Sequence, residues 1–242
     1  MKVWHKVALI VLPAVLIAAI GVWLIHAVRN RPAVVSHPVA ERHLSDEEMV
    51  QPRKLYIDDI KSAKDLIRKP VWVQAGYELP WFPYSGRHVD FAHKIGVLPS
   101  VQRLDIKNIV IEEVPAGVKT GMPSGTAQAF AVFTMPGDAK EYATAVGTIQ
   151  GHDSTWYCDT VFYYDDPHQM YNFWPASLWQ AVDAHQPKPG MTELETAMAL
   201  GVMQQSNSSD YGNRTVDYDA GGKHWAVTFE NDKATAIQPN PQ

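Results

Sequence analysis

The feature that most constrains this chain is an uninterrupted apolar run near its N-terminus. Residues 7–28 read VALIVLPAVLIAAIGVWLIHAV and contain no formally charged side chain. A helix rises about 1.5 Å per residue, so a run of this length spans a hydrocarbon core of about 30 Å. Trp4 and Trp23 lie near its two ends, where indole rings favour the membrane interface. We therefore interpret residues 1–28 as a short tail followed by a transmembrane anchor.

The alternative interpretation of this run is a cleaved signal peptide. The apolar region of such a peptide usually spans about 7–15 residues and ends at a small-residue cleavage site. This run is longer, and Arg29 and Arg31 follow it directly. Lys2 and Lys6 nearly balance the basic residues after the run, but the short tail favours an inward N-terminus and an exported bulk. We expect a single-pass membrane protein whose larger part is periplasmic or extracellular.

Composition excludes several classes of protein. The 242 residues are 46% hydrophobic and carry a formal net charge of −5. The hydrophobic content rules out global disorder, and the acidic charge argues against nucleic acid as a partner because phosphate binding needs clustered basic residues. Cys158 is the only cysteine, which excludes an intramolecular disulfide and a multi-cysteine metal centre. No motif indicates a cofactor.

The remaining residues predict an α+β fold in three further parts. Residues 29–50 are polar and are interpreted as a tether, residues 51–185 as a β-rich domain with flanking helices, and residues 186–242 as a small helix-plus-antiparallel-sheet module. Short strands separated by Pro-Gly and Gly loops favour a small barrel or a curled antiparallel sheet for the middle part. The sequence does not choose between an SH3-like and an OB-like barrel.

Local patterns place individual elements. Ser45 begins a capping box with Glu48, and a second short helix is expected to open at Ser62, with Leu66 facing inward. Asp166 followed by proline predicts another helix start. Predicted strands cover residues 71–73, 104–111, 129–134, 142–149 and 155–164, and the second of these slips register near residues 107–108.

The C-terminal part reads as one helix followed by a meander. Thr192 begins a capping box, three strands are expected at residues 215–218, 225–229 and 234–237, and turns at residues 221–222 and 231–232. With this order, the part resembles the small-protein-A (BamE-like) family in the segments Lys188-Pro-Gly-Met-Thr192, Glu195, Leu200-Gly201, Val216-x-Tyr218, Trp225-Ala-Val-Thr-Phe229 and Lys233-Ala234.

The resemblance implies a cell-envelope module that binds other proteins and has no catalytic residues. Family members that belong to the outer-membrane assembly machinery are short lipoproteins. This chain instead has a predicted transmembrane anchor and a large preceding domain. The implied property is therefore protein binding by the module, and a role in outer-membrane assembly does not carry over.

Histidine and aspartate residues are the candidate metal ligands. Two histidines and a carboxylate suit Zn²⁺ or Fe²⁺, but the spacing is not HExxH, and Asp and His also serve as turn and cap residues. The candidates fall on different predicted loops: His88, Asp90, His93, His152, Asp166 and His168. A metal-assisted hydrolase built on these groups is the enzyme alternative. Cys158 lies in a strand-like run, where burial is a simpler interpretation than a reactive thiol.

Two groups of aromatic residues are the candidate ligand-binding residues. Large rings either form a recognition surface for a peptide or glycan, or bury themselves as core. If the two groups met, they would line a cleft, and the protein would be a small-ligand or glycan-binding sensor. The candidates are Tyr77, Trp81, Phe82, Tyr84, Tyr164 and Trp174.

Among these readings, the anchor, the C-terminal resemblance and the lack of a catalytic constellation favour a binding protein. We expect a membrane-anchored cell-envelope protein that acts by protein binding, as an accessory or scaffolding subunit of a membrane complex. Its expected partners are the membrane, through residues 7–28, and another protein of the envelope.

Overall fold

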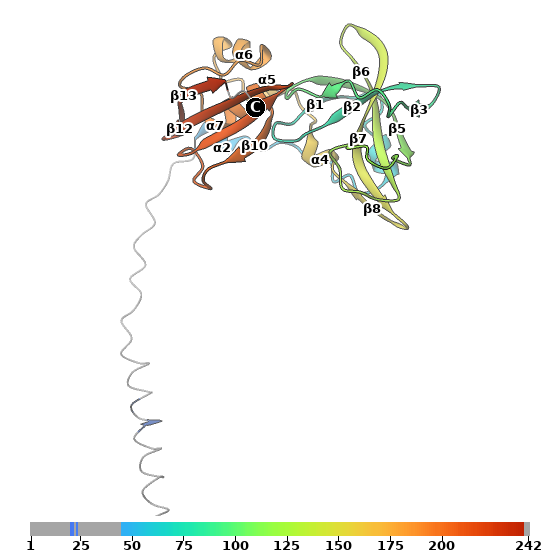
Figure 1. Cartoon of the computed structure of the whole chain (residues 1–242), viewed down its shortest axis with the longest axis horizontal. Coiled ribbons are helices and arrows are strands. Elements are labelled where there is room, and N and C mark those ends of the chain that lie inside the picture. Colours follow the sequence, from blue (N-terminus) through green and yellow to red (C-terminus); the bar gives the residue numbers. More distant parts are fainter. Residues whose placement is uncertain (1–19, 22, 24–44, 240–242) are drawn as a thin grey trace, which may run out of the picture. The chain divides into compact units, whose positions relative to one another are not determined.

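A computed structural model describes residues 45–239 together with Ile20, Gly21 and Trp23 (Figure 1). The chain divides into two compact units, Met1–Leu44 and Ser45–Gln242. Apart from those three residues, the predicted anchor at residues 7–28 lies outside the described residues, and so does the predicted tether as far as residue 44. Within the described part, no helix has the length and apolar character needed to span a bilayer.

The second unit is an α+β structure in which a nine-stranded antiparallel sheet is the larger element. Its strands are β1 (Pro70–Val73), β2 (Pro80–Ser85), β3 (His88–Val89), β4 (Gly96–Val97), β5 (Arg103–Glu112), β6 (Ala127–Met135), β7 (Asp138–Gln150), β8 (Asp153–Trp156) and β9 (Phe162–Tyr163). The main path runs β3-β2-β7-β6-β5-β1-β9, with β4 added to β2 and β8 added to β7. The path has two separate ends, so the described residues form an open sheet and not a closed barrel. The predicted register slip in β5 is confirmed between Ile106 and Asn108.

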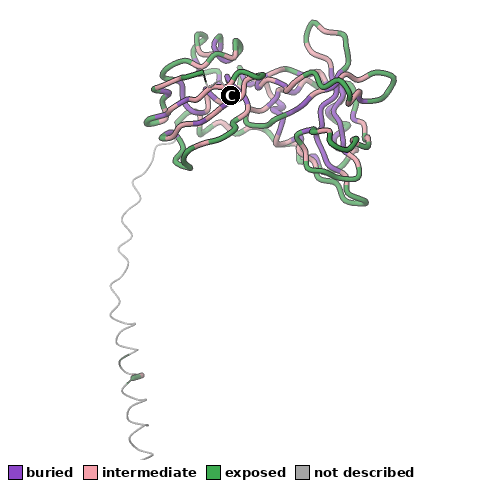
Figure 2. The backbone as a smooth tube through the Cα atoms, viewed as in Figure 1, coloured by how far each residue is buried: buried purple, intermediate pink, exposed green. Residues whose placement is uncertain are grey.

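The centre of this sheet is buried on both faces. Phe130 and Val132 of β6 pack with Phe82 on one face, whereas Ala131 and Phe133 pack with residues of β1 and β5 on the other. Side chains alternate between faces along a strand, so the predicted alternation over residues 129–134 fills two cores instead of one. Figure 2 shows this centre as the purple, buried part of the backbone.

A four-stranded sheet follows helix α7 (Glu193–Leu200). Its strands are β10 (Val202–Ser206), β11 (Thr215–Ala220), β12 (Lys223–Glu230) and β13 (Lys233–Pro239), paired as an antiparallel meander in chain order. The capping box at Thr192 is present, and the three predicted strands and both predicted turns are confirmed. β10 is an addition to the predicted three strands.

The remaining helices are short. They are α2 (Asp46–Met49), α3 (Ile60–Lys64), α4 (Cys158–Val161), α5 (Pro167–Met170) and α6 (Ala176–Asp183). The start predicted for the second helix is wrong: Asp59 is the cap, and Ser62 is the third helical residue, which bonds back to it. The strand predicted over residues 155–164 is confirmed only towards its two ends, in β8 and β9, because the helical turn α4 interrupts it.

That helical turn has a tertiary cause. Asp159 of α4 accepts hydrogen bonds from the backbone N–H groups of Leu55 (2.9 Å) and Ile57 (3.3 Å), and from the Tyr164 hydroxyl (2.8 Å). These partners lie about a hundred residues upstream or a few residues downstream, and an extended strand would not present one carboxylate to all of them. We call residues 45–57, which Asp159 holds at their C-terminal end, the N-terminal strap.

The N-terminal strap touches a second core at its other end. Glu47 accepts hydrogen bonds from the Trp174 indole N–H (3.0 Å) and the Thr192 hydroxyl (3.2 Å). This core combines α5 to α7 and the four-stranded sheet with Val101 and Tyr163 from the region of the nine-stranded sheet. The division of the chain at residue 185 stays a prediction.

Candidate functional site

The predicted metal ligands lie in three separate places. His93 contacts Asp90 (2.7 Å), and His88 points to Glu112 at 3.9 Å. His168 contacts Asp166 (3.0 Å) and Asp183 (3.1 Å) and stacks on Trp179, while His152 lies in the exposed turn after β7. Among the described residues, no group of three or more His, Cys, Asp or Glu side chains is arranged to hold a metal ion. The convergence of loops that the hydrolase alternative requires does not occur there.

Most of the predicted aromatic ligand-binding residues pack as core. Phe82 is 1% exposed, and Tyr164 and Trp174 are also buried. Trp81 packs edge-on against Tyr142, with ring centroids 4.6 Å apart. Tyr84 is partly buried beside Phe82, and Tyr77 is 42% exposed. The two groups are not brought together as one cleft: Trp81 lines one hollow and Tyr164 another.

Cys158 is buried in the core beneath the nine-stranded sheet. Burial disfavours the thiolate and raises the pKa of its thiol to about 12, with a smaller contribution from the neighbouring Asp159 carboxylate. A nucleophilic cysteine needs an accessible thiolate. Cys158 is therefore a packing residue.

The hollow with the most distinctive surroundings lies between β4 and β10. It is a groove of about 620 Å³, lined on one side by Ile95 and Val97 and on the other by Val202 and Gln204. We call it the β10 groove. Each bounding strand is paired on one side only, β4 with β2 and β10 with β11. The groove also extends over Asp219 of β11, the Gly221-Gly222 turn and His224 of β12.

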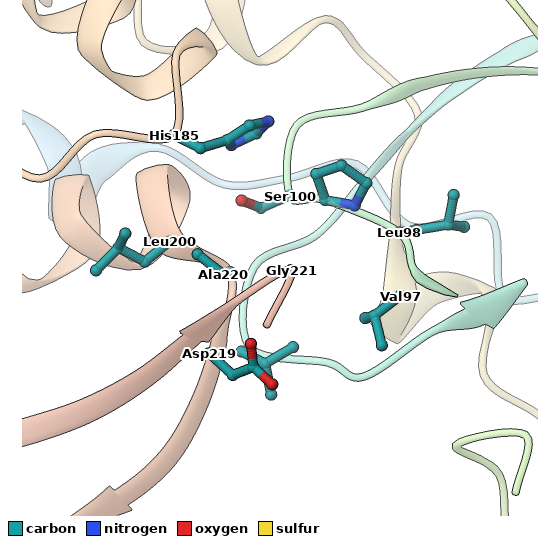
Figure 3. Close-up of a pocket in the computed structure, with 11 residues that line it drawn as sticks. Val97, Leu98, Ser100, His185, Leu200, Asp219, Ala220 and Gly221 are labelled. Carbon is teal, nitrogen blue, oxygen red and sulfur yellow. The ribbon is translucent and has the colours of Figure 1, made fainter. Parts of the chain in front are cut away.

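A smaller cavity of about 110 Å³ adjoins the β10 groove, with which it shares Val97, Pro99, Val202, Asp219 and Gly221. We call it the Ser100 cavity (Figure 3). Leu98, Leu200 and Ala220 add apolar walls, and Ser100, His185 and Asp219 are its polar side chains. These three come from the loop after β4, the end of α6 and the end of β11.

The end of α7 explains how two of these polar groups are held. The last carbonyls of a helix have no partner within the helix. The Ser100 hydroxyl donates to the Met198 carbonyl (2.6 Å), and His185 Nδ1 lies 3.1 Å from the Ala199 carbonyl. A carbonyl oxygen only accepts, so His185 Nδ1 is the donor. Both side chains are therefore C-terminal caps of α7 as well as walls of the cavity.

Backbone conformation also marks this place. Val101, the residue after Ser100, has φ 61°, and His185 has φ 53°. A β-branched residue in the left-handed region costs on the order of 1–3 kcal/mol and persists only where the surroundings fix it. Val101 is fixed by its backbone N–H, which donates to the Val73 carbonyl (2.8 Å), and by burial in the second core. The loop that carries Ser100 is thus rigidly placed.

None of the three polar residues of the Ser100 cavity belongs to a sequence motif. They lie far apart in the chain, and each follows the end of an element or lies next to a turn, where Ser, His and Asp are ordinary. The one local signal is the Gly221-Gly222 turn, which positions Asp219: its Oδ1 accepts a hydrogen bond from the Gly222 N–H (2.7 Å).

Comparison of the chain with models of protein families, with curated proteins and with solved structures gives no match.

Proposed function

We propose that this protein is a membrane-anchored cell-envelope protein that binds another protein. A strand of the partner would pair with the free edge of β10. The protein would act as an accessory or scaffolding subunit of a membrane complex. The observation that carries the proposal is that β10 is an exposed, uncharged edge strand beside a groove. An exposed row of backbone N–H and C=O groups is a template for pairing with another chain.

The other edge strands in the described part show how unusual β10 is. Native edges are protected by shortness, charge or proline. β3, β4 and β9 have two residues each, β8 carries Asp153, and β13 carries Lys233 and Pro239. β10 has five residues with neither charge nor proline, and its Met203 is 45% exposed. Its one protection is a bulge at Gln204.

The register of β10 identifies a backbone group that faces the free edge. The Asn207 N–H donates inward to the Thr215 carbonyl (3.2 Å). Ser206, the preceding residue, pairs with Val216. Successive residues of an antiparallel strand point their N–H groups to opposite sides, so the Ser206 N–H points away from β11. A partner strand would accept a hydrogen bond from it.

Two features of the sequence are consistent with this proposal. The apolar run at residues 7–28 would anchor the chain in the membrane. The helix α7 and the meander that contains β10 form the part that resembles the BamE-like family, and that resemblance implies protein binding.

Site-specific photo-crosslinking tests the proposal in the full chain in its native membrane. p-Benzoylphenylalanine replaces Gln204, whose side chain lines the β10 groove, or Gln238 on the opposite edge strand β13. We expect one discrete adduct from position 204, joined to one contiguous segment of one protein, and none from position 238. No adduct from 204, or the same adduct from both positions, contradicts the proposal.

A matched pair of variants then asks whether the backbone edge is what binds. Ser206→Pro removes the outward N–H, whereas Ser206→Ala removes the side-chain bonds to Ser208 and keeps that N–H. We expect Ser206→Pro to abolish the adduct from position 204 and Ser206→Ala to retain it. An adduct that survives Ser206→Pro excludes strand addition.

A further inference from the structure

We infer that the Ser100 cavity is a receptor for a lysine side chain, carried by the strand that pairs with β10. The inference rests on the proposed function for the way the side chain arrives, but the cavity can be tested without it. The ligand chemistry is a primary ammonium at the end of an aliphatic stem. Three independent properties of the cavity lead to it.

The first property is that the polar side chains of the cavity have no donors left. The Ser100 hydroxyl gives its hydrogen to the Met198 carbonyl, and His185 Nδ1 gives its hydrogen to the Ala199 carbonyl. In the tautomer that carries its hydrogen on Nδ1, Nε2 is an acceptor, and the Asp219 carboxylate has acceptors only. A ligand that bonds to any of these side chains must supply donors. A lysine ammonium has three donors and no acceptor.

The second property is the sign of the charge. None of the residues that line the Ser100 cavity is Lys or Arg, and Asp219 contributes a carboxylate. The C-terminus of α7, an eight-residue helix, ends at Leu200 in the wall and adds the negative end of a helix dipole. In the adjoining β10 groove, the charges of Lys94 and Glu78 offset each other at 3.8 Å. Where the Ser100 cavity adjoins the β10 groove, the charge that has no counter-charge is therefore that of Asp219. This negative charge favours a cation.

The third property is the shape and lining of the space. A cavity of 110 Å³ is smaller than the roughly 150 Å³ cavity that accepts a benzene ring, so it suits an unbranched aliphatic stem. Val97, Leu200 and Val202 offer apolar walls for methylene groups. Figure 3 shows Asp219 on the opposite side of Ser100 from His185, with the apolar side chains between and around them. A lysine buries its stem along such walls and keeps its ammonium at a polar end.

The position of Asp219 links the cavity to the β10 groove. It lines both hollows, and it pairs in register with Val202, the first residue of β10. A strand added to the free edge of β10 would lie two strands, about 10 Å, from Asp219 on β11, so a long side chain would have to cross the face of β10 to reach the Ser100 cavity. The partner segment is thus an extended chain with a lysine at the position opposite the start of β10.

Binding of n-butylammonium, which reproduces the lysine side chain, tests the cavity directly. Saturation-transfer NMR on the full chain in detergent measures its affinity, with n-butanol as the uncharged analogue. We expect Asp219→Asn to weaken n-butylammonium binding at least tenfold, because the asparagine oxygen can still accept from the Gly222 N–H but the charge is lost. Asp153→Asn on exposed β8 makes the same charge change elsewhere and should alter affinity less than twofold.

The outcomes separate this inference from the proposed function. No binding of n-butylammonium, equal binding by Asp219→Asn, or equally tight binding of n-butanol overturns the lysine receptor, even if the crosslink from position 204 is intact. Equally tight binding of n-butylguanidinium overturns the assignment to lysine. Binding of n-butylammonium that follows the expected pattern supports the lysine receptor. If that binding is found but no adduct forms from position 204, strand addition alone is overturned.

Discussion

Glu193 is a carboxylate that the start of α7 buries, with 3% of its surface exposed. It accepts hydrogen bonds from Arg214 Nε (3.0 Å) and from the Gly212 N–H (2.9 Å), and it forms an ion pair with Arg214 Nη2. A buried charge of this kind is tolerated only while its partner is present. The pair therefore fixes the loop between β10 and β11 to the helix.

Removing the arginine should be costly because it leaves Glu193 buried and unpaired. We expect Arg214→Met to lower the free energy of unfolding by about 3–5 kcal/mol, which is a fall in Tm of roughly 6–20 °C for a chain of this size. Arg103→Met is the control, since its pair with Asp105 is half-exposed and should cost under about 1 kcal/mol. Similar shifts in both variants, measured by circular dichroism, would contradict this account.

Glu47 is a half-buried carboxylate whose charged form is disfavoured in the folded protein. Burial, followed by the nearby Glu195 charge, raises the pKa of Glu47 above its ordinary value. At a pH between the ordinary pKa of this glutamate in the unfolded chain and its raised pKa in the folded chain, the unfolded chain has lost the Glu47 proton and the folded chain keeps it. The folded state is therefore destabilised as the pH rises through this window, and the full penalty persists above the raised pKa.

Glu47→Gln should remove this penalty, because an amide oxygen still accepts from Trp174 and Thr192 but does not ionise. We expect its Tm to exceed that of the wild type by roughly 1–2 °C at pH 7 and to match it near pH 4. Glu230→Gln, at an exposed position of β12, should leave the profile unchanged. If the Tm of Glu47→Gln minus the Tm of the wild type were smaller at pH 7 than at pH 4, the charge of Glu47 would not be destabilising.

At the scale of elements, the loop from β5 to β6 depends on one close approach. Gly121 has φ 79°, and a Cβ atom there would lie 2.1 Å from the Glu78 carbonyl oxygen. Gly117, in the same loop, has φ 86° but no atom within 4 Å of such a Cβ. The two glycines share a left-handed backbone conformation, which would strain any replacing residue, and differ in the space around them.

Alanine at each position should separate the two effects. We expect Gly121→Ala to cost about 2–4 kcal/mol, because the Glu78 backbone must move, and Gly117→Ala to cost about 1 kcal/mol from conformation alone. Urea denaturation of the two variants provides the comparison. Equal losses would show that the close approach does not contribute.

Elements that depend on local chemistry could be predicted, and those that depend on distant partners could not. The capping boxes at Ser45 and Thr192 follow from side chains three residues apart, and both are present. The helical turn α4 exists because Asp159 serves the N-terminal strap, about a hundred residues away. β10 reads Val-Met-Gln-Gln-Ser, which has no alternation, so its pairing with β11 is visible only in the fold.

The candidate site has no local signal of this kind. Aromatic and histidine clusters draw notice in a sequence, but most of the aromatic rings pack as core here and the histidines remain apart. Ser100 and His185 come together because both cap the end of α7, and Asp219 of β11 lines the same cavity. No spacing rule connects three residues of this kind.

At the scale of the whole second unit, the N-terminal strap joins the two cores. Its bonds to Trp174 and Thr192 lie at one end, and its bonds to Asp159 at the other. We expect Asp159→Asn, which weakens the acceptors for the strap, to speed hydrogen exchange at Leu55 and Ile57 at least tenfold while β6 is unaffected. The control Asp153→Asn should change neither region. Uniform acceleration in both cores would mean that the strap is not a separate unit of stability.

The burial of Cys158 makes the chain a ready background for sulfhydryl labelling. Its thiol is shielded by the core and stays protonated far above neutral pH, so a maleimide reagent should leave the folded wild-type protein unmodified. A single cysteine introduced on either side of residues 7–28 then becomes the one reactive site. Treating intact cells with a membrane-impermeant reagent would report the topology of the chain without removing any native residue.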